Sequence, residues 1–279
     1  MKLAFSSNAY LQFSIEESIR RISEIGYSGL EVLADVPHAW PAGLLRERRD
    51  AIREAIGRAG LEISNINAFM MNAVADPRQP YWHPSWIEPD RHYRQIRIDH
   101  TKRALSLARD LGARCITTEP GGPVNPGQSW SAAAALFVEG LKPVVEHAEN
   151  EGVLLLIEPE PGLLIERADQ FLEVVGRLDS AAVGMNFDVG HSFCVSEEPA
   201  DAIPKLRDHI RHFHLEDIAA NRVHQHLIPG RGAIDFQATL QAIREIGYDG
   251  WLTVELYPYL EDPDGAAREA FEYLLPLTQ

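Results

Sequence analysis

Cysteine is scarce in this sequence, and long apolar runs are absent from it. Its 279 residues include two cysteines, Cys115 and Cys194, which are too few for a disulfide framework. No segment approaches the roughly 20 consecutive apolar residues of a membrane-spanning helix. The first ten residues, MKLAFSSNAY, lack the apolar core of a secretory signal peptide. We therefore expect a soluble, cytoplasmic protein with no membrane partner.

Basic residues are in the minority. Lys and Arg together number 26 against 41 Asp and Glu, which gives a formal net charge of −15. An acidic surface repels phosphate backbones, so we expect no nucleic-acid partner. The sequence also shows no glycine-rich phosphate loop at the start of a helix, and Gly121-Gly122 is a weak candidate at most. The lack of such a loop favours an unphosphorylated ligand, with a phosphate ester left open as an alternative.

The sequence does contain a regular alternation of strand-like and helix-like segments. Short apolar runs typical of buried strands are separated by longer stretches whose apolar residues recur at helical spacing. Helical stretches begin after capping residues such as Ser14 and stop at glycines such as Gly112. The candidate strands are Leu3–Ser6, Gly29–Leu33, Glu62–Asn67, Cys115–Thr118, Val153–Glu158, Ala182–Asp188, Ile210–Leu215 and Trp251–Glu255. The candidate helices are Ile15–Ile25, Leu44–Ala59, Asp90–Leu111, Ser131–Asn150, Ala168–Leu178, Pro199–Arg207, Phe236–Ile246 and Gly265–Leu275.

This alternation predicts an α/β fold of the (β/α)8 TIM-barrel type. The chain has 279 residues, of which 45% are hydrophobic, and this length is usual for one such barrel. We therefore interpret residues 1–279 as a single domain.

Four of the later candidate strands end on side chains that bind metals. Glu158 ends VLLLIE, Asp188 ends VGMNFD, His214 lies near the end of IRHFHL, and Glu255 ends WLTVE. In a barrel of parallel strands these ends lie at one mouth, so we expect the four side chains to converge there. Three carboxylates and one imidazole form a suitable site for a divalent cation. A carboxylate after a single strand is often only a cap or a solvated loop residue, so the hypothesis depends on the joint pattern.

Three further polar residues follow candidate strands at the same mouth. His191 comes three residues after Asp188, and Glu119 follows the fourth strand in TTEPGG. Glu119 could contact hydroxyl groups of a ligand or cap the next loop. His38 follows the second strand in DVPHAW and could face the same pocket.

Two long loops also follow strand ends. Residues 68–89 carry Tyr81, Trp82 and Trp86 among prolines, and residues 218–234 carry histidines at 224 and 226. Aromatic residues in the first loop could form a lid over a pocket or a contact between subunits. We expect a homo-oligomer, a dimer or a tetramer, and the 81–86 stretch is the first candidate for its interface.

The chain resembles the xylose-isomerase-like TIM-barrel superfamily, in the branch of sugar isomerases and epimerases that includes D-tagatose 3-epimerase, hydroxypyruvate isomerase and inosose dehydratase. The resemblance spans nearly the whole length. It depends on IEPE at 157–160, NFDVGH at 186–191, HFHLED at 212–217, PGRGAIDF at 229–236 and TVELY at 253–257. This set of motifs is specific to the superfamily but not to one activity within it.

The resemblance implies that Glu158, Asp188, His214 and Glu255 bind one divalent ion. Manganese (Mn²⁺) is the ion expected, with Mg²⁺, Co²⁺ or Zn²⁺ as substitutes. The two glutamates would also be the catalytic acid and base. The resemblance further implies substrate-binding roles for His191 and, in a loosely aligned loop, for Arg222. The implied substrate is a ketose or related keto-polyol.

The residue types themselves permit this chemistry. A cation held by imidazole and carboxylates can polarise an α-hydroxyketone and stabilise the enediolate that forms when the α-proton is lost. Two glutamates on opposite faces could remove that proton and return one on the other side. Isomerisation or epimerisation is therefore the predicted reaction.

Other reactions remain open. A dehydratase acting on a keto-polyol, or a lyase cleaving a C-glycosidic bond of a keto-sugar, could use the same cation and enediolate. The fold family also includes apurinic-site endonucleases with three zinc ions. That reading is disfavoured by the net charge of −15 and by the absence of histidine at the ends of the third and fourth strands.

Overall fold

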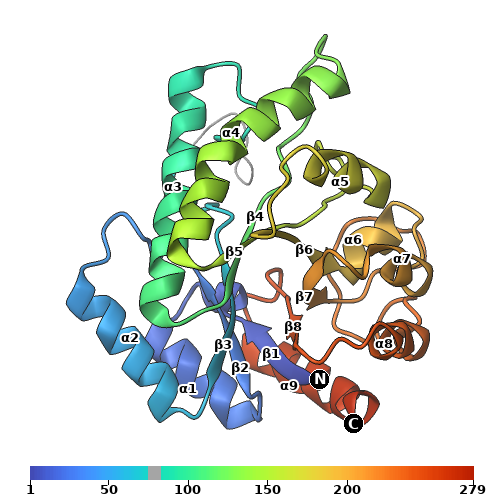
Figure 1. Ribbon diagram of the computed structural model, residues 1–279. Coiled ribbons are helices and arrows are strands. Elements are labelled where there is room, and N and C mark those ends of the chain that lie inside the picture. Colours follow the sequence, from blue (N-terminus) through green and yellow to red (C-terminus); the bar gives the residue numbers. More distant parts are fainter. Residues whose placement is uncertain (75–82) are drawn as a thin grey trace.

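The predicted barrel is confirmed by the structure, a computed structural model that describes residues 1–74 and 83–279. Within these residues eight parallel strands pair in sequence order, and β1 pairs with β8 to close the barrel. Figure 1 shows the strands at the centre of the molecule. Their bounds are β1 Lys2–Ser6, β2 Gly29–Leu33, β3 Glu62–Asn67, β4 Cys115–Thr118, β5 Leu154–Ile157, β6 Val183–Asp188, β7 Ile210–Leu215 and β8 Trp251–Val254.

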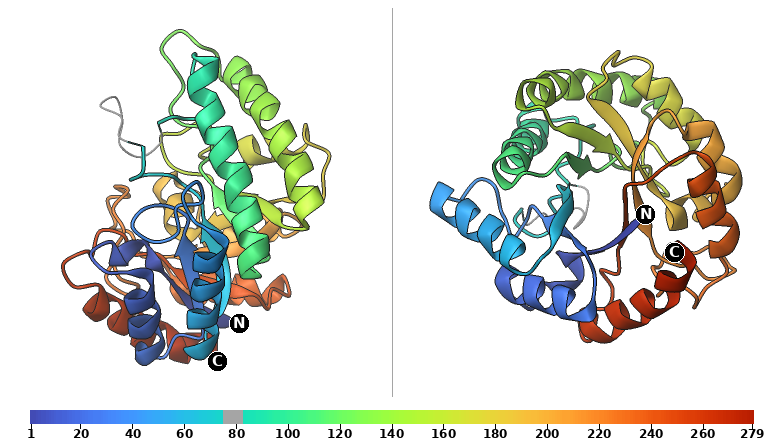
Figure 2. Two further views of the ribbon diagram at one scale, coloured as in Figure 1. Left: turned by 90° about the vertical axis from the view of Figure 1, so that its left-hand side faces the viewer. Right: turned by 60° about the horizontal axis from the view of Figure 1, so that its bottom comes forward.

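The helices form a ring outside the strands, as the right-hand view of Figure 2 shows. Their apolar stripes pack on the outer face of the barrel, which gives one continuous core from β1 to the last helix. Their bounds are α1 Ile15–Ile25, α2 Arg46–Arg58, α3 Arg91–Leu111, α4 Trp130–Glu151, α5 Ala168–Val175, α6 Val189–Cys194, α7 Pro199–Leu206, α8 Phe236–Glu245 and α9 Pro263–Thr278, with a 3₁₀ turn η1 at Ser7–Tyr10. In the described part of the chain, no helix combines the length and the apolar composition that crossing a bilayer requires.

The capping signals in the sequence mark real helix ends. The Ser14 side chain accepts a hydrogen bond from the Glu17 backbone N–H at the start of α1. Gly112 ends α3 with φ of +83°, a left-handed conformation that glycine adopts without a steric penalty. These local signals explain why most predicted boundaries agree with the structure to within a few residues.

Two predicted boundaries differ in a way that concerns the site. Strands β5 and β8 end at Ile157 and Val254, so Glu158 and Glu255 are the first residues beyond the ladder rather than its last members. The short helix α6, which begins directly after Asp188, was not predicted. Asp188 caps α6 by accepting a hydrogen bond from the His191 backbone N–H at 2.7 Å.

The aromatic loop at 68–89 is only partly described. Tyr81 and Trp82 lie outside the described residues. Trp86 has 1% of its surface exposed and donates a hydrogen bond from Nε1 to Thr118 Oγ1 at 3.2 Å. Trp86 is therefore a core residue of this chain and not part of an exposed aromatic surface.

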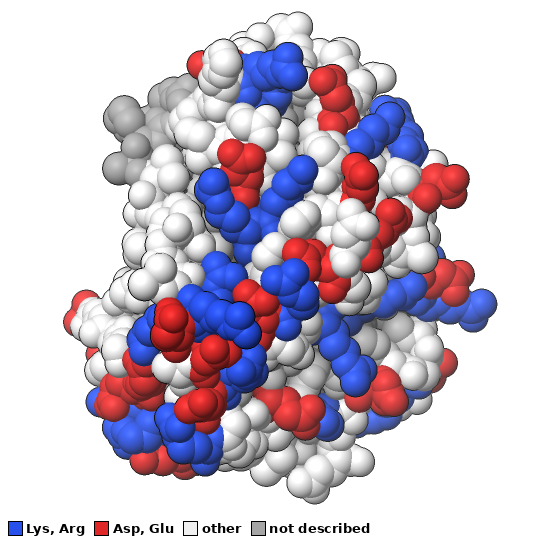
Figure 3. All heavy atoms as spheres, turned by 60° about the vertical axis from the view of Figure 1, so that its left-hand side comes forward, with Lys and Arg blue, Asp and Glu red and all other residues white. Residues whose placement is uncertain are grey.

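Charged side chains of both signs are interleaved on the face that carries α2 and α3, as Figure 3 shows. Arg49 pairs with Asp110 and Arg53 pairs with Asp50, so basic residues here have acidic neighbours.

The loop after β7 is held by one buried carboxylate. Asp217 Oδ1 accepts backbone N–H groups from Ile218 at 2.9 Å and Ile234 at 3.1 Å. Asp217 Oδ2 accepts those of Gly230 at 2.9 Å and Gly232 at 2.8 Å. A Cβ at Gly232 would lie 2.3 Å from Asp217 Oδ1, so this close approach requires glycine. Four hydrogen bonds to one carboxylate therefore hold the base of the loop that follows β7.

We predict that Asp217→Ala lowers the free energy of unfolding by about 3 kcal/mol or more, because it leaves several backbone donors without a charged acceptor. Asp235→Ala is the matched control, since Asp235 makes a single capping bond to Ala238 N and its loss should cost about 1 kcal/mol. Denaturant titration of both variants measures the difference. Equal, small losses would contradict the role given to Asp217.

Candidate metal centre and substrate cavity

The four strand-end residues Glu158, Asp188, His214 and Glu255 meet at the carboxyl-terminal mouth of the barrel. One ligand atom from each lies within 4.8 Å of the others. All four side chains are buried, with at most 6% of their surface exposed. They come from the ends of β5, β6, β7 and β8, which are consecutive neighbours in the barrel.

His214 lies at the centre of this group. Its Nδ1 is 3.0 Å from Glu158 Oε1, and its Nε2 is 2.8 Å from Oε2 of Glu31, the middle residue of β2. Asp188 Oδ2 and Glu255 Oε2 lie 3.9 Å and 3.7 Å from His214 Nδ1. One imidazole is therefore surrounded by four buried carboxylates.

The donor set fits a divalent cation. Asp188 Oδ2 is buried without a hydrogen-bond partner, which is costly unless a ligand satisfies it. Glu158, Asp188 and Glu255 also bring three carboxylates into one buried space, and a cation among them would offset their mutual repulsion. Carboxylate oxygens together with one imidazole nitrogen suit Mn²⁺, Mg²⁺, Co²⁺ or Zn²⁺.

Burial and mutual charge shift the pKa values of this group. Burial raises the pKa of Glu158 to about 7, against the opposing effect of His214. Burial also raises the pKa of Glu255 well above its usual range. Burial alone would lower the pKa of His214, but Glu158, Glu31 and Glu255 raise it well above normal. Without a cation, a proton on His214 therefore balances part of the carboxylate charge.

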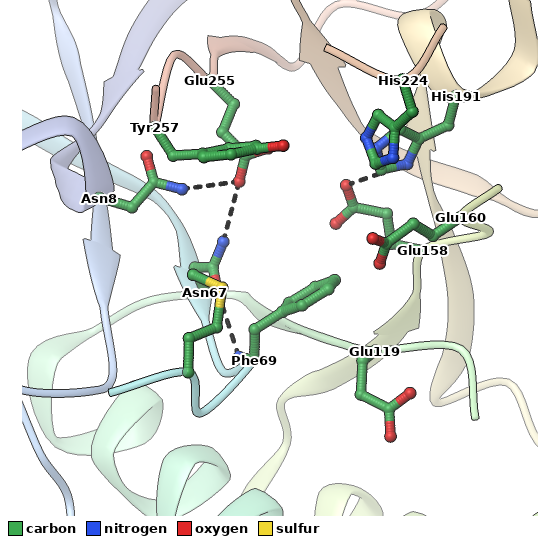
Figure 4. A pocket seen from close by; sticks show the side chains of 11 residues that line it. Asn8, Asn67, Phe69, Glu119, Glu158, Glu160, His191, His224, Glu255 and Tyr257 are labelled. Atoms are coloured by element: carbon green, nitrogen blue, oxygen red, sulfur yellow. Dashed lines mark hydrogen bonds and ion pairs between the residues drawn. The ribbon is translucent and has the colours of Figure 1, made fainter. Parts of the chain in front are cut away.

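A cavity of about 280 Å³ opens beside the metal-binding group. Figure 4 shows Glu255 and Glu158 on opposite sides of it, with His191 and His224 above Glu158 and Phe69 below. Its volume is at the small end of the range for ligand pockets, which suits a small metabolite. The cavity is lined by Asn8, Asn67, Phe69, Met71, Glu119, Glu158, Glu160, His191, His224, Glu255 and Tyr257.

Two of the predicted substrate-binding residues line this cavity. His191 Nδ1 donates a hydrogen bond to the Pro159 carbonyl at 3.0 Å, which leaves Nε2 as an acceptor. Glu119 also lines the cavity, but its oxygens accept backbone N–H groups from Trp86 at 3.3 Å and Gly121 at 2.5 Å. The loop-capping alternative for Glu119 thus has direct structural support.

The structure does not bring His38 and Arg222 to the cavity. His38 Nε2 lies 3.2 Å from the Tyr10 carbonyl and 3.3 Å from that of Phe13, so backbone acceptors occupy it. The Arg222 guanidinium lies over the Phe193 ring, 3.8 Å from its centre, and pairs with Glu198. Both side chains are held by local partners away from the lining residues.

The two histidines of the loop at 218–234 are placed differently. His224 lines the cavity, whereas His226 is buried behind it. The His226 Nδ1 donates to the Glu255 carbonyl at 3.0 Å. His226 therefore supports the backbone of a metal-binding residue.

Sequence reasoning missed several residues of the lining. Asn8, Asn67, Phe69, Glu160 and Tyr257 all face the cavity. Asn8 and Asn67 follow β1 and end β3, so their place at strand ends was a signal that could have found them. That signal was applied only to residues that titrate or bind metals.

The sequence profile of the xylose isomerase-like TIM barrel matches residues 19–277. The chain belongs to this family. One relative is fructoselysine 3-epimerase from Escherichia coli O157:H7. It is 26% identical to this chain over 280 residues, which cover 98% of this chain and 96% of the relative. Inosose dehydratase from Clostridium beijerinckii is 27% identical over 156 residues, about half of each chain. The crystal structure of a D-tagatose 3-epimerase-like protein has the same fold, with a TM-score of 0.82 at 24% identity over 100% of this chain and 98% of the other.

We predict that Glu31→Gln weakens binding of a divalent cation on the order of 10- to 100-fold, because Glu31 orients His214 through its Nε2. Glu62→Gln, at an exposed glutamate on neighbouring β3, is the control and should leave affinity unchanged. Titration calorimetry with Mn²⁺ measures both. Unchanged affinity in Glu31→Gln would contradict the orienting role.

Proposed function

We propose that the protein is a divalent-metal-dependent isomerase or epimerase of a ketose or related keto-polyol, with Mn²⁺ as its ion. The observation that carries this proposal is the placement of Glu158 and Glu255 on opposite sides of one cavity, each beside the metal-binding group. A substrate carbon between them is accessible to a carboxylate on each face. This arrangement suits removal of a proton from one face and its return to the other.

Proton transfer requires glutamates that are basic enough. When bound at this group, a divalent cation would polarise the carbonyl of an α-hydroxyketone and stabilise negative charge on its oxygens. Carboxylates near a cation lose basicity, and burial opposes that loss by raising the pKa of Glu158 and of Glu255. One glutamate can then accept the α-proton while the other donates a proton to the opposite face of the enediolate.

The relatives support a reaction of this class. The relative named fructoselysine 3-epimerase aligns over nearly the whole chain. A dehydratase is the second candidate, because inosose dehydratase aligns over about half of the chain. The two reactions share the enediolate and differ in its fate, which is reprotonation for an epimerase and loss of a hydroxyl group for a dehydratase.

The cavity lining favours an unphosphorylated substrate. Among the described residues, the lining carries Glu119, Glu158, Glu160 and Glu255 and neither lysine nor arginine. Recognition of a phosphate group ordinarily uses basic side chains or a helix N-terminus. A free ketose or keto-polyol avoids the repulsion that a phosphate ester would meet here.

We predict that the protein with Mn²⁺ in deuterated water incorporates deuterium at the α-carbon of a ketose substrate. Glu158→Gln and Glu255→Gln should each lower turnover on the order of 1,000-fold, since each removes one proton-transfer group. Glu62→Gln, on the protein surface, is the control. Full turnover in either active-site variant would exclude its assigned role, and loss of water without exchange into recovered substrate would favour the dehydratase.

We also predict that a free ketohexose reacts with kcat/KM at least about tenfold above that of its 6-phosphate, because the lining is acidic. Steady-state kinetics on D-fructose and D-fructose 6-phosphate measure the ratio. A higher kcat/KM for the phosphate would contradict the proposed substrate class.

A further inference from the structure

Glu255 is held by two side-chain amides on one of its oxygens. Glu255 Oε1 accepts hydrogen bonds from Asn8 Nδ2 at 2.9 Å and from Asn67 Nδ2 at 3.1 Å, and Figure 4 shows both bonds. Glu255 Oε2 takes neither bond and lies 3.7 Å from His214 Nδ1. The two oxygens of this carboxylate are therefore not equivalent, because one is anchored and the other faces the metal-binding group.

Glu158 shows the same division on the other side of the cavity. Its Oε2 accepts a hydrogen bond from Asn186 Nδ2 at 2.9 Å, and its Oε1 lies 3.0 Å from His214 Nδ1. Asn186 lies on β6, two residues before the metal-binding Asp188. Each of the two proposed proton-transfer glutamates thus has one oxygen anchored by asparagine and one oxygen beside His214 in the metal-binding group.

The anchoring residues suit an orienting role. An amide donates a hydrogen bond but neither takes nor gives up a proton at neutral pH, so it orients a carboxylate without neutralising it. Asn67 is itself fixed, because its Oδ1 accepts the Phe69 backbone N–H at 3.2 Å. The Oδ1 atoms of Asn8 and Asn186 are buried without a partner, an unfavourable arrangement that both residues maintain while their amide groups donate to the glutamates.

We infer that Asn8 and Asn67 position Glu255, and that Asn186 positions Glu158, so that one defined oxygen of each glutamate faces the substrate from its own side. This inference rests on the proposed epimerase function. In the forward step the α C–H bond breaks, its proton passes to one glutamate, and its electron pair enters the enediolate. In the second step the other glutamate gives a proton to the same carbon, a new C–H bond forms on the opposite face, and the carbonyl is restored.

If the two glutamates are anchored separately, proton transfer at one face of the substrate carbon can be slowed without slowing transfer at the other face. A variant that misaligns Glu255 slows proton transfer on the face of the carbon next to Glu255. Transfer on the face next to Glu158 is unchanged. From the epimer whose C–H bond faces Glu158, deuterium still enters the recovered substrate while conversion falls. From the other epimer, exchange and conversion fall together. A variant that misaligns Glu158 gives the reverse pattern.

The experiment compares Asn67→Leu and Asn8→Ala with Asn186→Leu as the matched variant on the opposite side. Each Mn²⁺-loaded protein is incubated in deuterated water with D-fructose and, separately, with D-psicose, which differ at C3. The ratio of deuterium in recovered substrate to net conversion is measured for each ketose. In Asn8→Ala and Asn67→Leu we expect this ratio to rise on the order of tenfold when one of the two epimers is the substrate. In Asn186→Leu we expect the same rise when the other epimer is the substrate.

The outcomes separate this inference from the proposed function. Absence of exchange by the unmodified protein with every ketose tested counts against the proposed function. Exchange by the unmodified protein, with the same change of ratio in all three variants, overturns separate positioning and indicates a shared structural role. Crystal structures of the variants with Mn²⁺ give a test that is independent of turnover. The inference predicts a rotated Glu255 carboxylate in Asn8→Ala and Asn67→Leu, and an unchanged orientation overturns it.

Discussion

Repulsion among buried carboxylates is the constraint on which the site depends. Glu31, Glu158, Asp188 and Glu255 surround His214 in a space closed to solvent, so their charges are poorly screened. Such a group is stabilised when its negative charge is offset, by a proton on the imidazole, by a proton on a carboxylate whose pKa burial raises, or by a metal ion. The same repulsion would favour a cation bound among these side chains. Repulsion among these carboxylates therefore underlies both the structure of this part of the barrel and the chemistry proposed for it.

The strand register turns this repulsion into a defined geometry. Asp188 on β6 and His214 on β7 are direct register partners, so neighbouring strands place their last side chains at the same height. Glu158 and Glu255 follow β5 and β8 by one residue and complete the set from the flanking strands. The backbone ladder thus fixes Asp188 and His214 directly and holds Glu158 and Glu255 through the strand ends that precede them.

The fold and the metal-binding group could be predicted from the sequence because both depend on local patterns. Apolar runs that end in Glu158, Asp188, His214 and Glu255 specify the strands and the ligands together. The remaining site residues depend on barrel closure and on side-chain direction, which local patterns do not encode. Asn8 reaches Glu255 across 247 residues of sequence. Arg222 follows a strand at the expected mouth, yet Phe193 and Glu198 hold its side chain elsewhere.

Barrel closure also has a consequence for the biogenesis of the site. The pairing of β1 with β8 brings Asn8 beside Glu255, so the first and last strands contribute to the same wall. A ribosome delivers β8 long after β1, and contacts of such high sequence separation form late in folding. The nascent chain can build most of the helical ring before this wall exists. The wall that carries Glu255 and its contact with Asn8 is therefore complete only after the last strand has paired with the first.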